Sequence, residues 1–247
     1  MFVSTSSRCL ADRPFLEACA VLTDLGFDKV ELWMDETGGH LKTSELVDDL
    51  DGFASRLRDN TRLTPVAFHL GDDVSPEVLG GLCRAAKLLR VAQITVPASP
   101  LGTPFNTEID RLREYVGIGG ENGIRISVKT QIGHLSEDPH TAVELCQSVR
   151  GLGLTLDPSH FVCGTHSGES FDQVFPYVYH VHLRDSSQRQ LQVPVGLGEI
   201  DYNRLISQLQ KENYRLALSV DLDGTDLDAD ALALEMRKLR MLLDSLL

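Results

Sequence analysis

Histidine and aspartate recur together in three short segments of the second half of the chain. Residues 157–160 read Asp-Pro-Ser-His, residues 180–185 read His-Val-His-Leu-Arg-Asp, and residues 219–221 read Ser-Val-Asp. Imidazole nitrogens and carboxylate oxygens bind zinc, manganese or cobalt, and the same groups transfer protons in enzymes. Each segment alone is a weak signal, so its value depends on whether the fold brings the three together.

Apolar runs in the first half also carry side chains with chemical functions. Glu31 and Trp33 lie in one run, His69 lies near the end of the next, and Lys129 ends a third, with His134 five residues later. Glu31 and Trp33 could frame a sugar through a hydrogen bond and ring stacking, or they could simply pack the end of the fold. The residue types alone leave both interpretations open.

The elements that must position these side chains follow one repeating pattern, a short β-branched apolar run followed by an amphipathic segment of helical period. The predicted strands cover residues 2–5, 29–33, 65–70, 93–97, 124–129, 152–157, 179–183 and 216–221. The predicted helices cover residues 14–25, 44–57, 76–89, 107–118, 139–149, 202–211 and 229–246. Eight strands in a chain of 247 residues predict an α/β fold, a (β/α)8 TIM barrel that forms one domain over residues 1–247. A doubly wound open sheet is the alternative.

A barrel would gather the polar segments in one place, because active sites of TIM barrels lie at the C-terminal ends of the strands. Asp157 and His160 straddle one predicted strand end, so both can reach a single centre. Successive strand residues point to opposite faces, so His180 and His182 share a face. If His182 points into the barrel mouth, His180 does so one layer lower.

Charge and composition exclude several other functions. The formal net charge is -13, which disfavours binding to nucleic acid. No apolar run reaches the ~18–20 residues of a membrane-spanning helix, and the first residues lack the pattern of a signal peptide. The five cysteines are scattered without a C-x-x-C pair, as expected in a reducing compartment. We therefore expect a cytoplasmic protein without membrane or nucleic-acid partners. The sequence leaves open whether the protein forms a homo-oligomer.

Several other motifs have simpler interpretations. His40, His140 and His166 are expected in solvated loops. Gly196-Leu197-Gly198 could approach a phosphate after the seventh strand, where barrels often bind one. The same glycines could instead form a tight turn into the helix that Asp201 would cap, and this second interpretation is favoured.

The segments at residues 26–33, 156–160, 180–185, 196–201 and 218–221 together resemble the xylose isomerase-like TIM barrels. This superfamily includes sugar epimerases, inosose dehydratase-like proteins and endonuclease IV, and the resemblance covers essentially the whole chain. It implies an isomerase or epimerase that acts on a small carbohydrate, a sugar or sugar phosphate, by proton transfer next to a carbonyl. A nuclease is disfavoured, because the fourth predicted strand ends without His and no Asp-x-His follows the seventh.

The resemblance also implies specific site residues. The epimerase branch binds one divalent metal, such as zinc, manganese, cobalt or magnesium, through Glu, Asp, His and Glu from strands five to eight. By position, Asp157, His182 and Asp221 match three of these metal ligands, and Lys129 stands in place of the first Glu. His160 matches a histidine that usually contacts substrate. The implied catalytic residues are thus Lys129, Asp221 and His160, and the implied substrate-binding residues are Glu31, Trp33, His69, His134 and Arg184.

The replacement of the first metal-binding Glu by Lys129 is the difference from the family pattern with the largest physical consequence. Two like charges about 4 Å apart repel by roughly 4 kcal/mol at an effective dielectric of 20, which is about a thousandfold in affinity. We therefore expect the Lys129 ammonium to pair with Asp157 or Asp221, and a metal to bind weakly or not at all. A desolvated lysine could also act as a base or Schiff-base nucleophile. Two hypotheses follow: an isomerase or epimerase with a degenerate metal site, or a metal-free barrel that binds a small polar ligand without catalysis.

Overall fold

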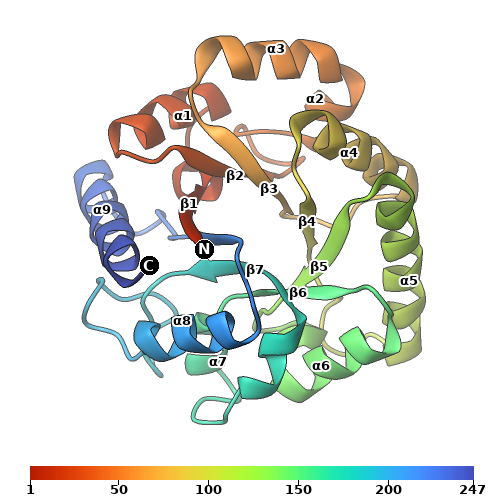
Figure 1. Ribbon diagram of the computed structural model, residues 1–247, viewed down its shortest axis with the longest axis vertical. Coiled ribbons are helices and arrows are strands. Elements are labelled where there is room, and N and C mark those ends of the chain that lie inside the picture. Colours follow the sequence, from red (N-terminus) through yellow and green to blue (C-terminus); the bar gives the residue numbers. More distant parts are fainter.

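The computed structural model describes all 247 residues and contains a closed barrel of eight parallel strands (Figure 1). Each strand pairs with its neighbours in chain order, and β1 pairs with both β2 and β8, which closes the barrel. This confirms the predicted (β/α)8 architecture and excludes the open sheet. The strands are β1 (Phe2–Ser6), β2 (Lys29–Met34), β3 (Thr64–Leu70), β4 (Gln93–Val96), β5 (Arg125–Lys129), β6 (Gly153–Leu156), β7 (Val178–Leu183) and β8 (Ala217–Val220).

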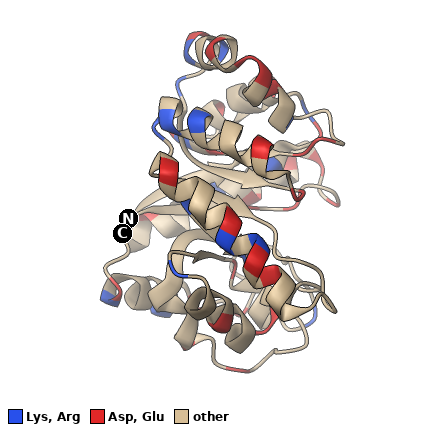
Figure 2. Cartoon of the chain, turned by 90° about the vertical axis from the view of Figure 1, so that its right-hand side faces the viewer, with Lys and Arg blue, Asp and Glu red and all other residues tan.

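Helices surround the barrel on its outside (Figure 1). They are α1 (Phe15–Asp24), α2 (Thr43–Asp48), α3 (Leu50–Asn60), α4 (Pro76–Leu89), α5 (Phe105–Asn122), α6 (Pro139–Ser148), α7 (Ser159–Val162), α8 (Tyr202–Lys211) and α9 (Ala229–Leu246). One apolar core combines strand residues such as Phe68 and Val181 with helix residues such as Leu22, Leu82 and Leu239. The apolar core is thus the layer between strands and helices, and charged side chains gather on the outer helices and loops (Figure 2).

Two local features differ from the sequence-based expectation. The helix predicted over residues 44–57 is two helices, α2 and α3, because Asp49 leaves the helical conformation at φ -138° and ψ 62°. The Asp49 side chain accepts a hydrogen bond from the Gly52 backbone N–H, so it caps α3. The short helix α7 was not predicted, and it carries His160 directly after β6.

The interior of the barrel is polar, in contrast to the branched apolar residues that usually fill TIM barrels. Near the start of β4, the Gln93 side chain donates to Ser127 Oγ at 2.5 Å and to Thr95 Oγ1 at 2.8 Å. Thr155 lies 2.7 Å from both Thr95 and Ser127, so four side chains from three strands share one hydrogen-bond network. Hydrogen-bonding groups therefore continue down the barrel from the mouth, where the candidate site lies.

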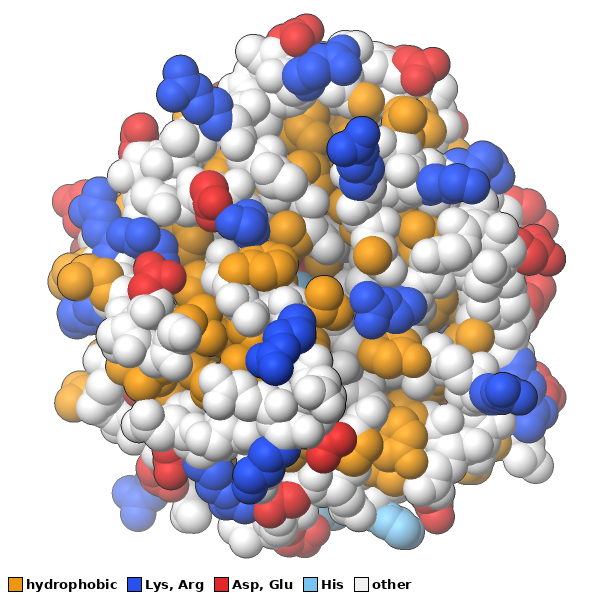
Figure 3. All heavy atoms as spheres, in the orientation of Figure 1, with side chains coloured by type: hydrophobic (Ala, Val, Ile, Leu, Met, Phe, Trp, Pro, Cys, Tyr) orange, Lys and Arg blue, Asp and Glu red, His pale blue; other side chains and the backbone are white.

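One face of the molecule can be followed in the space-filling view (Figure 3). On the face drawn in Figure 3, Lys and Arg side chains are spread out, with Asp and Glu mostly towards the edges. No helix combines the length and the apolar character that crossing a lipid bilayer requires.

Candidate active site at the barrel mouth

Two buried carboxylates lie at the C-terminal ends of their strands. Asp157 directly follows β6 and Asp221 directly follows β8, and neither is exposed to solvent. Lys129, the last residue of β5, places its Nζ 3.0 Å from Asp221 Oδ2 and 3.7 Å from Asp157 Oδ2. The ion pair expected for Lys129 is therefore present, and it joins both carboxylates.

Two arginines complete this charged centre. Arg184 follows β7, and its Nη2 lies 2.9 Å from Asp157 Oδ2 and 3.2 Å from Asp221 Oδ2. Arg8, in the 3-10 turn after β1, places Nη1 3.3 Å from Asp221 Oδ1 and Nη2 3.3 Å from Asp223 Oδ2. Arg8 was not among the site residues predicted from the sequence. Its position just beyond the end of the first strand was the available signal.

The cations keep both carboxylates ionised. Burial raises the pKa of Asp157, but Arg184, His160 and Lys129 together hold that pKa well below its usual value. Burial also raises the pKa of Asp221. The positive charges of Lys129 and Arg8 lower it by more, so the pKa of Asp221 also lies well below its usual value. A carboxylate with so low a pKa is a weak base as long as its cations stay in contact with it.

His160 turns a neutral ring towards this charged centre. Burial is the main cause that lowers the pKa of His160 to about 4, so its ring is neutral at pH 7. Its Nδ1 accepts from the Ile132 backbone N–H at 3.3 Å, which leaves the ring proton on Nε2. Nε2 lies 3.5 Å from Asp157 Oδ2. His160 therefore presents an N–H towards the charged centre.

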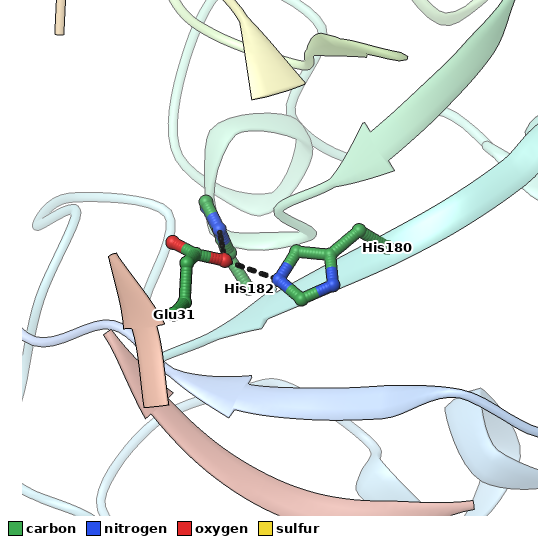
Figure 4. A group of neighbouring side chains, drawn as sticks. All are labelled: Glu31, His180 and His182. Atoms are coloured by element: carbon green, nitrogen blue, oxygen red, sulfur yellow. Dashed lines mark hydrogen bonds and ion pairs between the residues drawn. The ribbon is translucent and has the colours of Figure 1, made fainter. Parts of the chain in front are cut away.

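A second cluster, of three histidines around Glu31, adjoins the charged centre. Figure 4 shows the imidazoles of His180 and His182 turned towards one oxygen of Glu31, which comes from the opposite side of the barrel. Glu31 Oε2 accepts from His180 Nε2 and from His182 Nε2, the latter at 2.8 Å, and His69 Nδ1 lies 3.3 Å from Oε1. His182 Nδ1 lies 3.4 Å from Asp221 Oδ2, so it joins the two clusters.

Most of the predicted site residues are thus brought together. Contacts run from His160 through Asp157, Lys129 and Asp221 to His182, whose ring centroid lies 4.8 Å from that of His69. These side chains pack tightly at the mouth, and Lys129 is only 5% exposed. Glu31 is fully buried and faces imidazoles instead of a cleft.

Two predicted substrate-binding residues lie apart from this packed centre. Trp33 lines a cleft of about 610 Å³ together with Arg8 and Asp223, so it is connected to the centre through Arg8. His134 lines a different cavity, of about 210 Å³, with Arg111. No hydrogen bond or ion pair joins His134 to the charged centre, and its Nδ1 lies 3.2 Å from the Ile132 carbonyl oxygen.

The glycine loop after β7 is a turn and not a phosphate cradle. Asp185 Oδ2 accepts from the backbone N–H groups of Gly196 at 2.8 Å and of Gly198 at 3.0 Å. The N–H groups that would bind a phosphate are therefore already used by a carboxylate. Asp201 caps α8 through the Arg204 backbone N–H, as the turn interpretation predicted.

A divalent metal does not fit the position that the resemblance implies. The donor atoms of Asp157, His182 and Asp221 lie within 4.8 Å of one another, which is close enough for shared ligation. Yet both carboxylates already contact the Lys129 ammonium and the Arg184 guanidinium, so a metal between them would lie against two cations. The fourth ligand position is occupied by Lys129 itself.

Comparison with solved structures identifies barrels of the same shape. The probable 3-DHS dehydratase AsbF from Bacillus anthracis is 18% identical, with a TM-score of 0.73 over 97% of this chain and 98% of that chain. A xylose isomerase-like TIM barrel protein from Mycobacterium smegmatis, solved with magnesium, is 15% identical, with a TM-score of 0.79 over 99% and 97%. D-psicose 3-epimerase from Clostridium cellulolyticum H10, solved with D-tagatose, is 13% identical, with a TM-score of 0.73 over 100% and 98%.

At these identities the structural matches show a shared fold. A comparison with curated protein sequences gave no match. The family model described as "Xylose isomerase-like TIM barrel" matches residues 19–242, which include seven of the eight strands and all residues of the two clusters except Arg8. The chain therefore belongs to the xylose isomerase-like TIM barrel family.

Proposed function

We propose that this protein is a sugar or sugar-phosphate isomerase or epimerase in which Lys129 and Arg184 take the electrostatic role of the family's metal. The observation that supports this is the convergence of both cations on Asp157 Oδ2 and Asp221 Oδ2 at the barrel mouth. Proton abstraction next to a carbonyl needs positive charge where the oxyanion develops, and preorganised donors in a dry site supply it effectively.

The proposed roles follow from the contacts. A substrate carbonyl oxygen accepts hydrogen bonds from Lys129 and Arg184, which draws these cations away from Asp221. The pKa of Asp221 then rises towards its usual value, and the freed carboxylate becomes the base for the neighbouring carbon. His160 donates from Nε2 to a substrate hydroxyl, because that proton already points into the centre.

The cleft of about 610 Å³ beside the charged centre is the proposed route for the sugar. Trp33 offers an aromatic surface for the sugar ring, and Arg8 and Asp223 offer polar groups for its hydroxyls. The charged centre itself is nearly closed, so a substrate must displace side chains to reach Lys129. We propose a small carbohydrate as ligand, the cytoplasm as setting and one domain over the whole chain.

Deuterium exchange tests this function directly. The protein is incubated in deuterated water with ketohexoses, pentuloses and their phosphates, and NMR detects deuterium at the carbon next to the carbonyl. We expect exchange with at least one sugar, and a loss of at least about 100-fold for Lys129→Met, which removes the charge but keeps the length of the side chain. The matched control is Lys238→Met on the exposed face of α9, which should exchange at the wild-type rate.

The alternative function is a non-catalytic barrel that binds a small polar ligand. One observation favours it: Lys129, His69 and His160 are only 5%, 5% and 7% exposed, which is little for catalytic groups. Binding of a sugar without any exchange, measured by calorimetry on the same panel, would support this alternative and reject the isomerase.

A further inference from the structure

The cluster of Glu31, His69, His180 and His182 has no part in the proposed proton transfer, yet it is among the most polar buried regions of the chain. Glu31 and His182 are fully buried, and His69 and His180 are 5% and 2% exposed. The four side chains come from three different strands, β2, β3 and β7. Because β2 and β7 are not neighbours, their side chains meet only inside the closed barrel.

Glu31 is a buried carboxylate without a lysine or arginine partner. Asp157 and Asp221 each contact lysine or arginine, whereas the ion-pair partners of Glu31 are histidines only. His69 Nδ1 lies 3.3 Å from Glu31 Oε1 and His182 Nε2 lies 2.8 Å from Glu31 Oε2, so the groups that face this carboxylate are imidazoles. A buried negative charge without a fixed cation is unfavourable unless a cation joins it.

Several polar atoms of the cluster also lack hydrogen-bond partners. These are Glu31 Oε1, His69 Nδ1 and His182 Nδ1. Glu31 Oε1 and His69 Nδ1 lie 3.3 Å apart, and His182 Nδ1 lies 3.4 Å from Asp221 Oδ2, yet none of these contacts has hydrogen-bond geometry. Most buried polar atoms in folded proteins form a hydrogen bond, so this cluster has capacity for a further binding group.

The tautomer of His182 indicates what that group is. If Nε2 carries the proton and donates to Glu31, the Nδ1 lone pair faces the carboxylate of Asp221 at 3.4 Å, which is repulsive. If Nε2 binds a metal instead, the ring proton moves to Nδ1 and donates to Asp221. This carboxylate–histidine–metal arrangement is the usual outer shell of histidine ligands.

We propose that Glu31, His180 and His182 bind a zinc ion inside the barrel, next to His69. The donor atoms of the first three lie within 4.8 Å of one another (Figure 4). Imidazole nitrogens with one carboxylate are a typical zinc set, whereas magnesium and calcium prefer oxygen ligands. The site includes His180, one layer deeper than His182, and it uses neither Asp157 nor Lys129, so it differs from the position that the family resemblance implies.

The test measures zinc binding and not turnover, so its result does not depend on the proposed isomerase activity. Protein stripped with a chelator is titrated with zinc chloride by calorimetry, and bound zinc is counted by elemental analysis after dialysis. We expect one zinc per wild-type chain. His180→Ala should weaken binding at least about 100-fold, because it removes one ligand without touching the charged centre.

Two control variants identify the site. Asp157→Asn should bind zinc within about threefold of the wild type, because Asp157 belongs to the charged centre only. His166→Ala removes a histidine from the partly exposed group of Asp138, His166 and Glu169, which could bind zinc adventitiously, and it should also leave the affinity unchanged. Loss of binding in either control, with binding retained in His180→Ala, would overturn the proposal, as would a wild-type chain that binds no zinc.

A second readout covers the case in which His180→Ala does not fold. Cobalt(II) replaces zinc in the wild-type protein, and its visible absorption reports the number and type of ligands. We expect the intense visible bands of a four-coordinate site with nitrogen ligands. Only the weak bands of a six-coordinate, water-rich ion would contradict the proposal.

Discussion

Lys129 determines what the charged centre can bind, because its ammonium contacts both carboxylates that a metal at the family position would use. We predict that Lys129→Glu creates a divalent-metal site from residue 129, Asp157, His182 and Asp221. The substitution removes one positive charge and adds a carboxylate, so manganese affinity that depends on Asp157 should rise about a thousandfold.

Calorimetry on four proteins measures this effect: the wild type, Lys129→Glu, and each of them combined with Asp157→Asn. Manganese binding that needs Asp157 should appear only in the Lys129→Glu background. If the wild type also loses tight binding with Asp157→Asn, Lys129 does not exclude the metal.

Two buried histidines make the stability of the protein depend on pH. Burial lowers the pKa of His69 and of His160 to about 4, whereas an unfolded histidine titrates near 6.5. Between these values the unfolded state binds more protons, so stability is complete above about pH 6.5 and falls as the pH drops towards 4. From pH 7.5 to pH 5 we expect a loss of about 2 kcal/mol per histidine in the free energy of unfolding.

Urea titrations at the two pH values check this prediction. His160→Gln should lose about 2 kcal/mol of the pH dependence, and His140→Gln, a change of an exposed side chain on α6, should retain it all. Parallel pH profiles for the wild type and His160→Gln would contradict the prediction, because they would mean that folding leaves the pKa of His160 unchanged.

The sequence correctly predicted which side chains meet where these side chains lie at the ends of strands. Asp157, His182 and Asp221 meet because parallel strands end on one side of the barrel, and Lys129 joins them for the same reason. His40 was wrongly expected in a solvated loop: it is 4% exposed, with its Nε2 2.9 Å from Ser7 Oγ and its Nδ1 2.7 Å from the Arg13 carbonyl oxygen. Such loop contacts depend on how distant turns pack, and the sequence carries no periodic signal for them.

At the level of elements, α5 rests on β5 through a glycine. A Cβ on Gly119 would lie 2.6 Å from the Ile124 carbonyl oxygen and 2.8 Å from Ile126 Cγ1. We predict that Gly119→Ala lowers the free energy of unfolding by about 1–3 kcal/mol, because the helix must move away from the strand.

Gly117 in the same helix is the matched control, since a Cβ there would meet nothing within 4 Å. Gly117→Ala should raise stability by about 0.5–1 kcal/mol, because alanine favours the helix. Denaturant melts of both variants compare the two signs directly. A stabilising Gly119→Ala would mean that α5 does not contact β5 closely.

Element boundaries show what periodicity can and cannot predict. The limits of α4, α8 and α9 agree with their predicted ranges, because capping residues and apolar spacing coincide there. The break at Asp49 was missed, because the apolar period continues across it while the aspartate caps the second helix. A cap inside an amphipathic run is therefore the feature that period alone does not detect.

For the whole molecule, the polar interior of the barrel has an energetic consequence. Thr155 Oγ1 has hydrogen-bond partners on β4 and β5, so Thr155→Val would leave buried hydroxyl and amide groups with fewer partners. We predict a loss of about 1–3 kcal/mol, although valine has the same shape as threonine.

Thr64→Val, at the exposed start of β3, controls for the change of residue type and should alter stability by less than about 0.5 kcal/mol. Thermal and urea unfolding of both variants provide the measurement. Equal stability of Thr155→Val and the wild type would show that water or the remaining hydroxyls compensate for the lost group.

The closure of the barrel between β1 and β8 also governs the order in which the chain can fold. Glu31 on β2 meets His180 and His182 only when β7 is in place, and Lys129 meets Asp221 only after β8 has joined. An intermediate that contains β1 to β6 alone would leave Glu31 with only His69 and Lys129 with only Asp157, without their shorter contacts to β7 and to Asp221, so it should stay open and hydrated. We therefore expect slow, late closure, with the amides of β1, β7 and β8 becoming protected from hydrogen exchange together in a pulse-labelled refolding experiment. Early protection of β1 and β2 alone would contradict this order. If the three strands become protected together, the last quarter of the chain controls how fast the first quarter becomes stable.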